Sequence, residues 1–312
     1  MERTIWVIGG ANIDVCGMTH NHLMMHDSNI GEIEVSFGGV GRNIAEMITL
    51  LGGPVHFVSC FSDDVFGQLL QEDCKKKGMK IDDSIISKQY SSSMYAAILD
   101  EEGEMIAAVN DMRILDEVSE DYLNQIIEKA HEDDIIVLDG NLSEELFEKL
   151  SNNAKAKIAA DPVSVAKCKR LESALDRITI FKPNQYEAAA LSGIEIHDEA
   201  SAKEALNFFK EKGVKEIIIS LGKDGVLFGT EEELKWIHHR KVDVHNVTGG
   251  GDALLAAYIT ERFNGASPNE AILFAISSAI LRIEAKMDEK NNITTEMIKD
   301  NLNKSEIEET LL

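Results

Sequence analysis

The 312-residue sequence predicts an α/β fold in three layers, with a mostly parallel central sheet between two layers of helices and a small β-sheet lid. Short apolar runs rich in β-branched residues alternate with longer stretches of helical periodicity, and the short runs are apolar almost throughout. Strands buried on both faces show this pattern, because helices cover a parallel sheet on each side. Two segments break the alternation, and they predict the lid.

The expected strands and helices alternate up to about residue 242, after which helices dominate. The strands are expected at residues 4–8, 55–60, 134–138, 158–160, 178–181 and 216–220. The helices are expected at residues 42–51, 65–77, 122–130, 144–152, 186–191, 200–212, 249–263, 268–285 and 294–302. No repeat or low-complexity stretch divides the chain, so residues 1–312 are expected to form a single domain.

The lid is expected from residues 14–37 and 91–111, inserted in that domain. Residues 95–99 and 104–109 read as two strands joined by a polar turn that contains Gly103, which is the pattern of a β-hairpin. A small sheet with one apolar face needs a cover. The sequence therefore predicts a homodimer formed through the lid.

Composition excludes several classes of protein. With 55 Asp and Glu against 31 Lys and Arg, the net charge is -24, which argues against a nucleic-acid partner. An anionic substrate would need a site made electropositive by backbone N–H groups, a helix N-terminus or a metal ion. The four cysteines lack metal or disulfide spacing. There is no signal-peptide pattern and no membrane-spanning run, so we expect a cytoplasmic protein with no membrane partner.

The strongest chemical signal is a glycine-rich loop that runs directly into a helical pattern. Gly249, Gly250 and Gly251 allow successive N–H groups to point one way, and the helix N-terminus adds its positive dipole end, which makes an anion hole. Asp252 follows at the same turn, where a carboxylate can accept a proton from a hydroxyl beside a transferring phosphoryl group. The alternative is a structural loop with Asp252 as a helix N-cap.

This loop, with Thr248 and Asn246 before it, resembles the C-terminal signature of the ribokinase-like sugar kinases, also called the phosphofructokinase-B family. The resemblance implies the ribokinase-like fold, ATP and Mg²⁺ as cofactors, and Asp252 as the catalytic base. Asn246 stands where the family commonly has Asp, which leaves a monovalent-cation (K⁺) site open. Gly250 stands where Ala is usual, and we expect it to keep the anion hole while loosening it.

A second signature of the same family lies near the N-terminus, at residues 9–14 and 38–43. By this resemblance the sugar site is lined by Asn12, Asp14, Gly38, Gly39 and Asn43. A carboxylate and two amides suit ribose, because the carboxylate accepts from vicinal hydroxyls while the amides donate and accept. Taken alone, Asp14 after a strand would be a turn residue. A dinucleotide-binding fingerprint is excluded, since the third glycine is missing.

Two further motifs match the nucleotide side of the family's site. Asn184 and Glu187 resemble an N-x-x-E element, in which Glu187, acting through water and with Asn184, would hold Mg²⁺. Their alternative role is a polar first helical turn. Ser220, Gly222 and Gly225 resemble the turn beside ATP, and Thr248 joins them as a nucleotide-binding residue. The alternative for that turn is a plain hairpin.

Within the family, residues 41–46 and 109–115 look most like pseudouridine kinases. By this resemblance Asn110 and Asp111 reach the sugar or base, and Met112 packs on the base. The hypothesis is ATP-dependent phosphorylation of the pseudouridine 5′-hydroxyl. The alternatives are a ribokinase, another nucleoside kinase, a fructose or ketodeoxygluconate kinase, or a catalytically silent sugar or nucleoside sensor. The intact glycine loop and Glu187 argue against the sensor.

Overall fold

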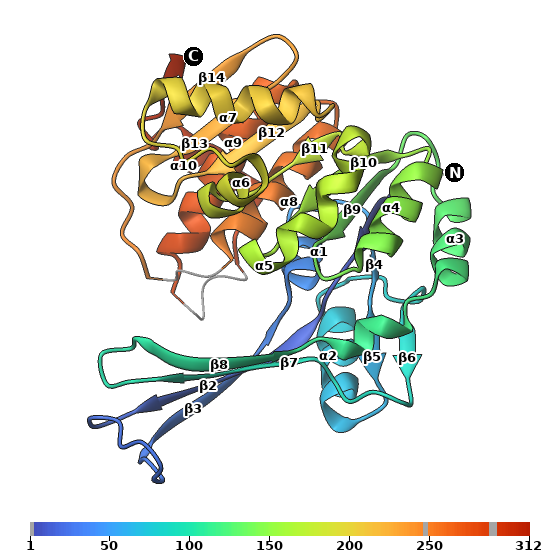
Figure 1. The fold of residues 1–312 in the computed structure, drawn as a ribbon, viewed down its shortest axis with the longest axis vertical. Helices are drawn as coiled ribbons and strands as arrows, with labels where there is room; N and C mark the ends of the chain where they lie inside the picture. The colour runs from blue at the N-terminus through green and yellow to red at the C-terminus, as the bar shows by residue number, and fades with distance from the viewer. Residues whose placement is uncertain (1–2, 246–248, 287–291) are drawn as a thin grey trace.

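The computed structural model describes residues 3–245, 249–286 and 292–312, which form a large α/β body with a flat sheet projecting from it (Figure 1). The sheet in the body has nine strands among the described residues, in the order β15-β14-β13-β12-β11-β10-β9-β1-β4. In chain order their bounds are β1 Ile5–Ile8, β4 Val55–Val58, β9 Ile135–Asp139, β10 Lys157–Asp161, β11 Ile180–Phe181, β12 Glu216–Ser220, β13 Val226–Gly229, β14 Leu234–His238 and β15 Glu308–Leu311.

Six of these strands, from β4 to β12 across the sheet, are parallel, and the predicted mostly parallel sheet is confirmed. The remaining strands, β13 to β15, are antiparallel and were not predicted from the sequence. The sequences of β14 and β15 mix polar and apolar residues and lack the continuous apolar run by which the parallel strands are recognised. β13 is a short apolar run, Val226–Gly229, that was not recognised as a strand.

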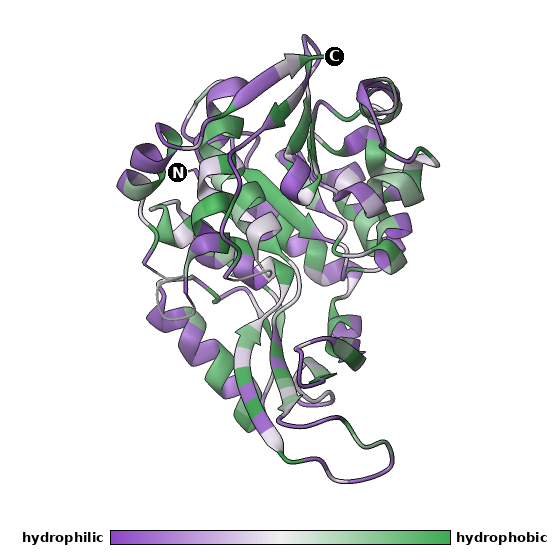
Figure 2. Cartoon of the chain, turned by 90° about the vertical axis from the view of Figure 1, so that its left-hand side faces the viewer, coloured by the Kyte–Doolittle hydropathy of each residue, from purple (hydrophilic) through white to green (hydrophobic). Residues whose placement is uncertain are grey.

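Helices cover both faces of the sheet and divide the core into two layers. One layer contains α1 Val40–Leu50, α8 Gly250–Phe263, α9 Pro268–Glu284 and α10 Thr295–Leu302. The other contains α3 Glu120–Lys129, α4 Glu144–Asn153, α6 Gln185–Ser192, α7 Glu199–Glu211 and the 3₁₀ segment Lys169–Arg177. Neighbouring strand residues alternate between the layers, as Trp6 and Val7 do. Figure 2 accordingly shows the central strands as mostly hydrophobic.

The projecting sheet is the lid, with strand order β3-β2-β7-β8, and the expectation of a separate small sheet is confirmed. Its strands are β2 Asn12–Thr19, β3 Gly31–Gly38, β7 Met94–Leu99 and β8 Met105–Asp111. A further helix, α2 Val65–Lys76, and the strand pair β5 Cys60–Ser62 and β6 Ile85–Ser87 lie near the base of the lid (Figure 1). The short helix α5 is Val165–Cys168.

The two faces of the lid differ in chemistry. Residues paired across the strands share a face, so Asp14, Tyr95 and Asn110 lie on one side. The other side carries apolar residues that include Val35 and Val109, and Val109 is 71% exposed. Near the base of the lid this side packs against the core through Val15 and Phe37, whereas Val35 and Val109 are exposed.

Strand β1 lies between β4 and β9 in the sheet. After β1 the chain continues to β4 on one side, and after β9 it continues to β10 on the other, so the strand order reverses between β1 and β9. In open α/β sheets this switch point is where ligands bind. The loops after β1, β9, β10 and β11 and the start of α8 meet there and build the site described below. Within the described residues no helix is long and apolar enough to cross a membrane.

Candidate active site

Asp252 lies in the first turn of α8, as the glycine loop predicts. Gly249 is the N-cap and adopts a left-handed conformation with φ +82°, which favours glycine. The first N–H groups of a helix have no intrahelical acceptor, so this turn presents donors and a positive dipole end. A carboxylate and a set of anion-binding N–H groups therefore occupy one helix start.

Gly250, the position where Ala is usual in the family, packs against α9. A Cβ atom at Gly250 would lie 2.9 Å from Cγ1 and Cδ1 of Ile283 on α9. Ile283 thus fills the space that a methyl group would occupy, and the loop start is packed against α9. An alanine at this position would require the Ile283 side chain to shift.

Asn43 connects α1 with the Asp252 side chain. Its Nδ2 donates to Oδ2 of Asp252 at 2.9 Å, across 209 residues of sequence. Enclosure by protein, followed by the negative charge of Asp161, raises the pKa of Asp252 to about 7. The hydrogen bond from Asn43 and the positive charges of Lys182 and Arg282 oppose this shift. The carboxylate is therefore poised to exchange a proton near neutral pH.

Lys182 and Asp161 form a buried ion pair directly below the glycine loop, with Nζ 3.0 Å from Oδ2. The Lys182 ammonium also approaches Gly251, where a Cβ atom would lie 3.1 Å from it. Burial disfavours the charged form, but the carboxylates of Asp161 and Glu187 raise the pKa of Lys182 above its ordinary value. The site thus holds a protonated lysine beneath its anion-binding loop.

Asn184 and Glu187 form a capping box at the start of α6. The Oδ1 atom of Asn184 accepts from the N–H groups of Tyr186 and Glu187, and Oε2 of Glu187 accepts from the Asn184 N–H at 2.8 Å. The structural alternative for this motif is therefore realised. Glu187 is only 3% exposed, and burial raises the pKa of its carboxyl. A divalent cation nearby would favour the ionised form of this carboxyl.

The carboxyl groups around Lys182 suit a divalent cation held through water better than one held directly. Among the described residues no group of three or more His, Cys, Asp or Glu side chains could hold a metal directly. Asp161, Glu187 and Asp252 nevertheless place three carboxyl groups around the single ammonium of Lys182. This excess of acid fits Mg²⁺ bound largely through water and ATP phosphates.

The turn predicted to lie beside ATP is also a hairpin, which joins the antiparallel strands β12 and β13. The Ser220 N–H donates to the carbonyl of Pro183 at 3.1 Å, which places Ser220 beside Asn184. Gly222 and Gly225 both have positive φ, and a Cβ atom at Gly225 would overlap the carbonyl oxygen of Ile237. Thr248 and Asn246 lie outside the described residues.

The two N-terminal glycine motifs are held together by a residue that the sequence did not single out. Asp139, at the end of β9, accepts from the N–H groups of Gly10 at 2.8 Å and Gly41 at 2.9 Å. Gly39, with φ +103°, caps α1 so close to β1 that a side chain would overlap the Gly10 carbonyl. A buried carboxylate therefore fixes the floor of the predicted sugar site.

The predicted sugar ligands lie above this floor. Asn12 donates to the carboxylate of Asp14, and Gly38 packs directly against that carboxylate. Asn110 shares the lid face of Asp14. Asp111 does not, because adjacent strand residues point to opposite faces, and its carboxylate binds Arg113 instead. The structure therefore separates Asp111 from the other predicted ligands.

Met112 comes close to the floor, together with two residues that sequence reasoning missed. A Cβ atom at Gly10 would lie 2.6 Å from Cε of Met112 and 2.8 Å from Nδ2 of Asn141. Lys167 donates to Oδ1 of Asn141 at 2.6 Å, and burial lowers the pKa of this lysine. A half-buried amide and amine therefore stand beside Met112, next to the predicted sugar site.

The missed residues differ in how far the sequence could have indicated them. Asp139 and Asp161 each end a strand predicted to be parallel, and polar residues at such ends gather at one edge of the sheet. Lys182 begins the motif that contains Asn184. Lys167 and Arg282 lie within helices and carry no local signal.

Comparisons with known proteins agree with this geometry. Residues 2–294 match the family described as pfkB family carbohydrate kinase. The pseudouridine kinase of Escherichia coli (strain K12) is 37% identical over 271 residues, covering 86% of this chain and 87% of that protein.

Two solved structures share the fold. A carbohydrate kinase from Agrobacterium tumefaciens has a TM-score of 0.84 at 24% identity and covers 99% of this chain and 100% of that one. Arabidopsis thaliana ribokinase, in a structure with ribose and ATP, has a TM-score of 0.82 at 21% identity and covers 97% of this chain and 99% of that one. The matched span contains both glycine motifs, the start of α6 and the Asp252 loop, and the chain therefore belongs to the pfkB family of ATP-dependent carbohydrate kinases.

Proposed function

We propose that the chain transfers the γ-phosphoryl group of ATP to the 5′-hydroxyl of pseudouridine, with Asp252 as general base. The observation that carries this proposal is the hydrogen bond between Asn43 and Asp252, because it brings the predicted sugar site against the base. The 37% identity to the Escherichia coli pseudouridine kinase supports the choice of nucleoside.

In the proposed reaction Asp252 accepts the proton of the 5′-hydroxyl as that oxygen attacks the γ-phosphorus. The 5′-oxygen, left with the O–H electron pair, forms the new P–O bond, while the bond from the γ-phosphorus to the bridging oxygen breaks and ADP leaves with the electrons of that broken bond. A carboxylate with a pKa of about 7 is a stronger base than an ordinary aspartate and is still largely ionised just above neutrality. The N–H groups of Gly249, Gly250 and Gly251 stabilise the charge on the transferred group.

The nucleotide is proposed to lie between the start of α8 and the Ser220 turn, with Asn184, Gly222, Gly225 and Thr248 contributing. Mg²⁺ bound with ATP would offset the negative charge of the β- and γ-phosphates. Glu187 would hold the Mg²⁺ through water, since the side-chain Oδ1 of Asn184 already accepts hydrogen bonds in the capping box. The ammonium of Lys182, held by Asp161, adds a fixed positive charge on this side of the cleft.

The nucleoside is proposed to lie between the lid and the ends of β1 and β9. Asn12, Asp14 and Asn43 would bind the ribose hydroxyls with the backbone at Gly38 and Gly39 close by. The base would pack on Met112. A uracil ring presents both donors and acceptors, and Asn110 and Asn141 are amides that can pair with them.

The lid is proposed to form a homodimer. Its apolar face carries Ile33, Val35 and Val109, which are 75%, 54% and 71% exposed. A second copy of the same face is the simplest cover for such a surface.

The test is an ATP-consumption assay over pseudouridine, uridine, ribose, adenosine, fructose and ketodeoxygluconate, with and without K⁺. We expect the highest kcat/KM for pseudouridine. Equal activity with ribose would mean that the base is not recognised, and the specificity proposal would then be wrong. Nucleoside binding without turnover of any of these substrates would support the sensor alternative instead.

A further inference from the structure

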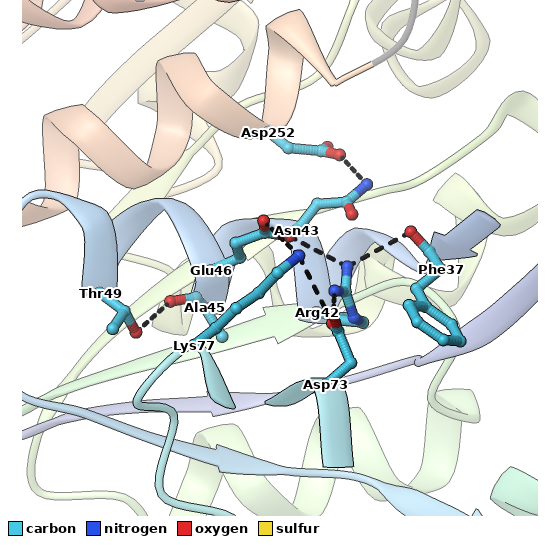
Figure 3. Close-up of polar contacts among 9 residues, drawn as sticks. All are labelled: Phe37, Arg42, Asn43, Ala45, Glu46, Thr49, Asp73, Lys77 and Asp252. Carbon is cyan, nitrogen blue, oxygen red and sulfur yellow. Dashed lines mark hydrogen bonds and ion pairs between the residues drawn. The ribbon is translucent and has the colours of Figure 1, made fainter. Parts of the chain in front are cut away.

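Arg42 is among the largest fully buried side chains of the described residues and is 1% exposed. It lies where the lid strand β3, helix α1 and helix α2 meet (Figure 3). Its Nη1 donates to the carbonyl of Phe37 at 3.3 Å and to Oε2 of Glu46 at 3.0 Å, and its Nη2 donates to the carboxylate of Asp73. One guanidinium thus ties together three separate elements.

Lys77 completes the network by binding both carboxylates. Its Nζ lies 2.7 Å from Glu46 and 3.4 Å from Asp73, so two cations face two acids. Burying such charges is costly, and well-packed apolar side chains often stabilise a fold equally well. The Nε of Arg42 has no hydrogen-bond partner among the described residues, which adds to the cost. Stability alone is therefore a poor reason for this arrangement.

The position of the network along the chain suggests a better reason. Between Phe37 in the lid and Asn43 in α1 the chain passes from Gly38, the last residue of β3, through the N-cap Gly39 with φ +103° into the helix. The side chain of Arg42 reaches back across this turn to the Phe37 carbonyl, and its Cζ lies 5.7 Å from the centre of the Phe37 ring. A rigid fork therefore bridges the turn between strand and helix.

The residue after Arg42 is Asn43, which hydrogen-bonds Asp252. We propose that Arg42 is a positioning residue that makes the end of β3 and Asn43 move as one unit, so that seating the lid on the substrate sets Asn43 against Asp252. This inference rests on the roles proposed above for Asn43 and Asp252. The buried network consists of Arg42, Glu46, Asp73 and Lys77. By this inference it connects substrate binding with the base.

The link has a consequence for the pH profile. Asp252 is faced by Asp161, Lys182 and Arg282 as well as by Asn43. Asn43 follows Arg42 in the chain, and Arg282 interacts with the charges of Glu46 and Arg42, so the network acts on Asp252 through these two residues. Loss of the contact with Asn43 removes a hydrogen bond to the ionised carboxylate. The acidic limb of kcat/KM should then move to higher pH, whereas a purely structural network would leave it in place.

The experiment compares Arg42→Lys and Asp73→Asn with Arg262→Met as a matched control. Asp73 lies on α2 and binds Arg42 and Lys77, so its substitution perturbs the network without changing a residue of the proposed site. Arg262 also forms a two-point ion pair, with Glu216 at 3.0 and 2.6 Å, but at the far end of α8. Kinetics use the nucleoside that the unmodified protein phosphorylates best, and hydrogen exchange follows the amides of residues 31–38.

We expect Arg42→Lys and Asp73→Asn to lower nucleoside kcat/KM by about 10- to 100-fold, as misplacement of a positioning contact does, with ATP KM unchanged. Amide exchange in residues 31–38 should accelerate, and the acidic limb should shift upward. Arg262→Met should lower Tm without these changes. In a double-mutant cycle Asn43→Ala and Asp73→Asn should be non-additive, because both act on one contact.

Two outcomes separate this inference from the proposed function. Asp73→Asn and Arg42→Lys could lower Tm as Arg262→Met does, yet leave nucleoside kcat/KM, its pH dependence and amide exchange in residues 31–38 unchanged. In that case the positioning role is wrong. If the unmodified protein phosphorylates no nucleoside, or Asp252→Asn stays active, the proposed function fails instead. The exchange comparison needs no turnover, so it still tests whether the network ties the lid to α1.

Discussion

At the scale of single residues, Asp252 shows how the surroundings raise the pKa of an ordinary carboxyl. Enclosure and the nearby charge of Asp161 raise its pKa to about 7, and Asn43, Lys182 and Arg282 prevent a larger shift. The same surroundings favour the protonated form of the folded protein. Asp252 should therefore contribute to activity and detract from stability at neutral and alkaline pH.

Asp252→Asn should keep the fold and ATP binding but lower kcat by about 10²- to 10⁴-fold, because an amide cannot accept the proton. Residual turnover should remain, since the N–H groups of the glycine loop are unchanged. The measurement is steady-state kcat at saturating ATP, Mg²⁺ and nucleoside, with isothermal titration of ATP as the control. Near-normal kcat would remove Asp252 from the role of base.

The raised pKa also predicts a pH dependence. The base works when deprotonated, so kcat/KM, which reports the free protein, should fall about tenfold per pH unit below a limb near pH 7. Because the pKa of Asp252 is higher in the folded than in the unfolded protein, its protonation stabilises the folded protein at pH values below the unfolded pKa. This stabilisation is lost as the pH rises through 7. Asp252→Asn should hence raise Tm at pH 8 and leave it nearly unchanged at pH 4. An acidic limb of kcat/KM near pH 4 would contradict the raised pKa of Asp252.

At the scale of elements, the start of α8 depends on α9. Gly250→Ala should destabilise the protein by about 1 kcal/mol, because the new methyl group meets Ile283 in an already packed space. Ile283→Val removes Cδ1, one of the two obstructing carbons, so Gly250→Ala should cost less in the Ile283→Val background. The measurement is urea unfolding of the single and double variants. Equal effects of Gly250→Ala with and without Ile283→Val would show that the packing does not limit this loop.

At the scale of the whole molecule, the lid projects from the body and exposes apolar residues on one face. Val109→Lys places a charge in the centre of that face and should convert a dimer into a monomer while the body stays folded. Ile86→Lys, at a 47% exposed apolar position on β6, is the matched control and should remain dimeric. Light scattering after size exclusion measures both. A monomeric unmodified protein would rule out the lid dimer.

The parallel sheet, its helices, the lid and the position of Asp252 in a helical first turn follow from the sequence, because periodicity and glycine placement are local properties. The opposite orientations of Asn110 and Asp111 were also accessible, since strand residues alternate. Tertiary structure alone decided the packing of Gly250 on Ile283, the pairing of Lys182 with Asp161, and the contact of Asn43 with Asp252. Such contacts join elements far apart in the chain, and both the geometry and the pKa values that result depend on burial, which no local pattern encodes.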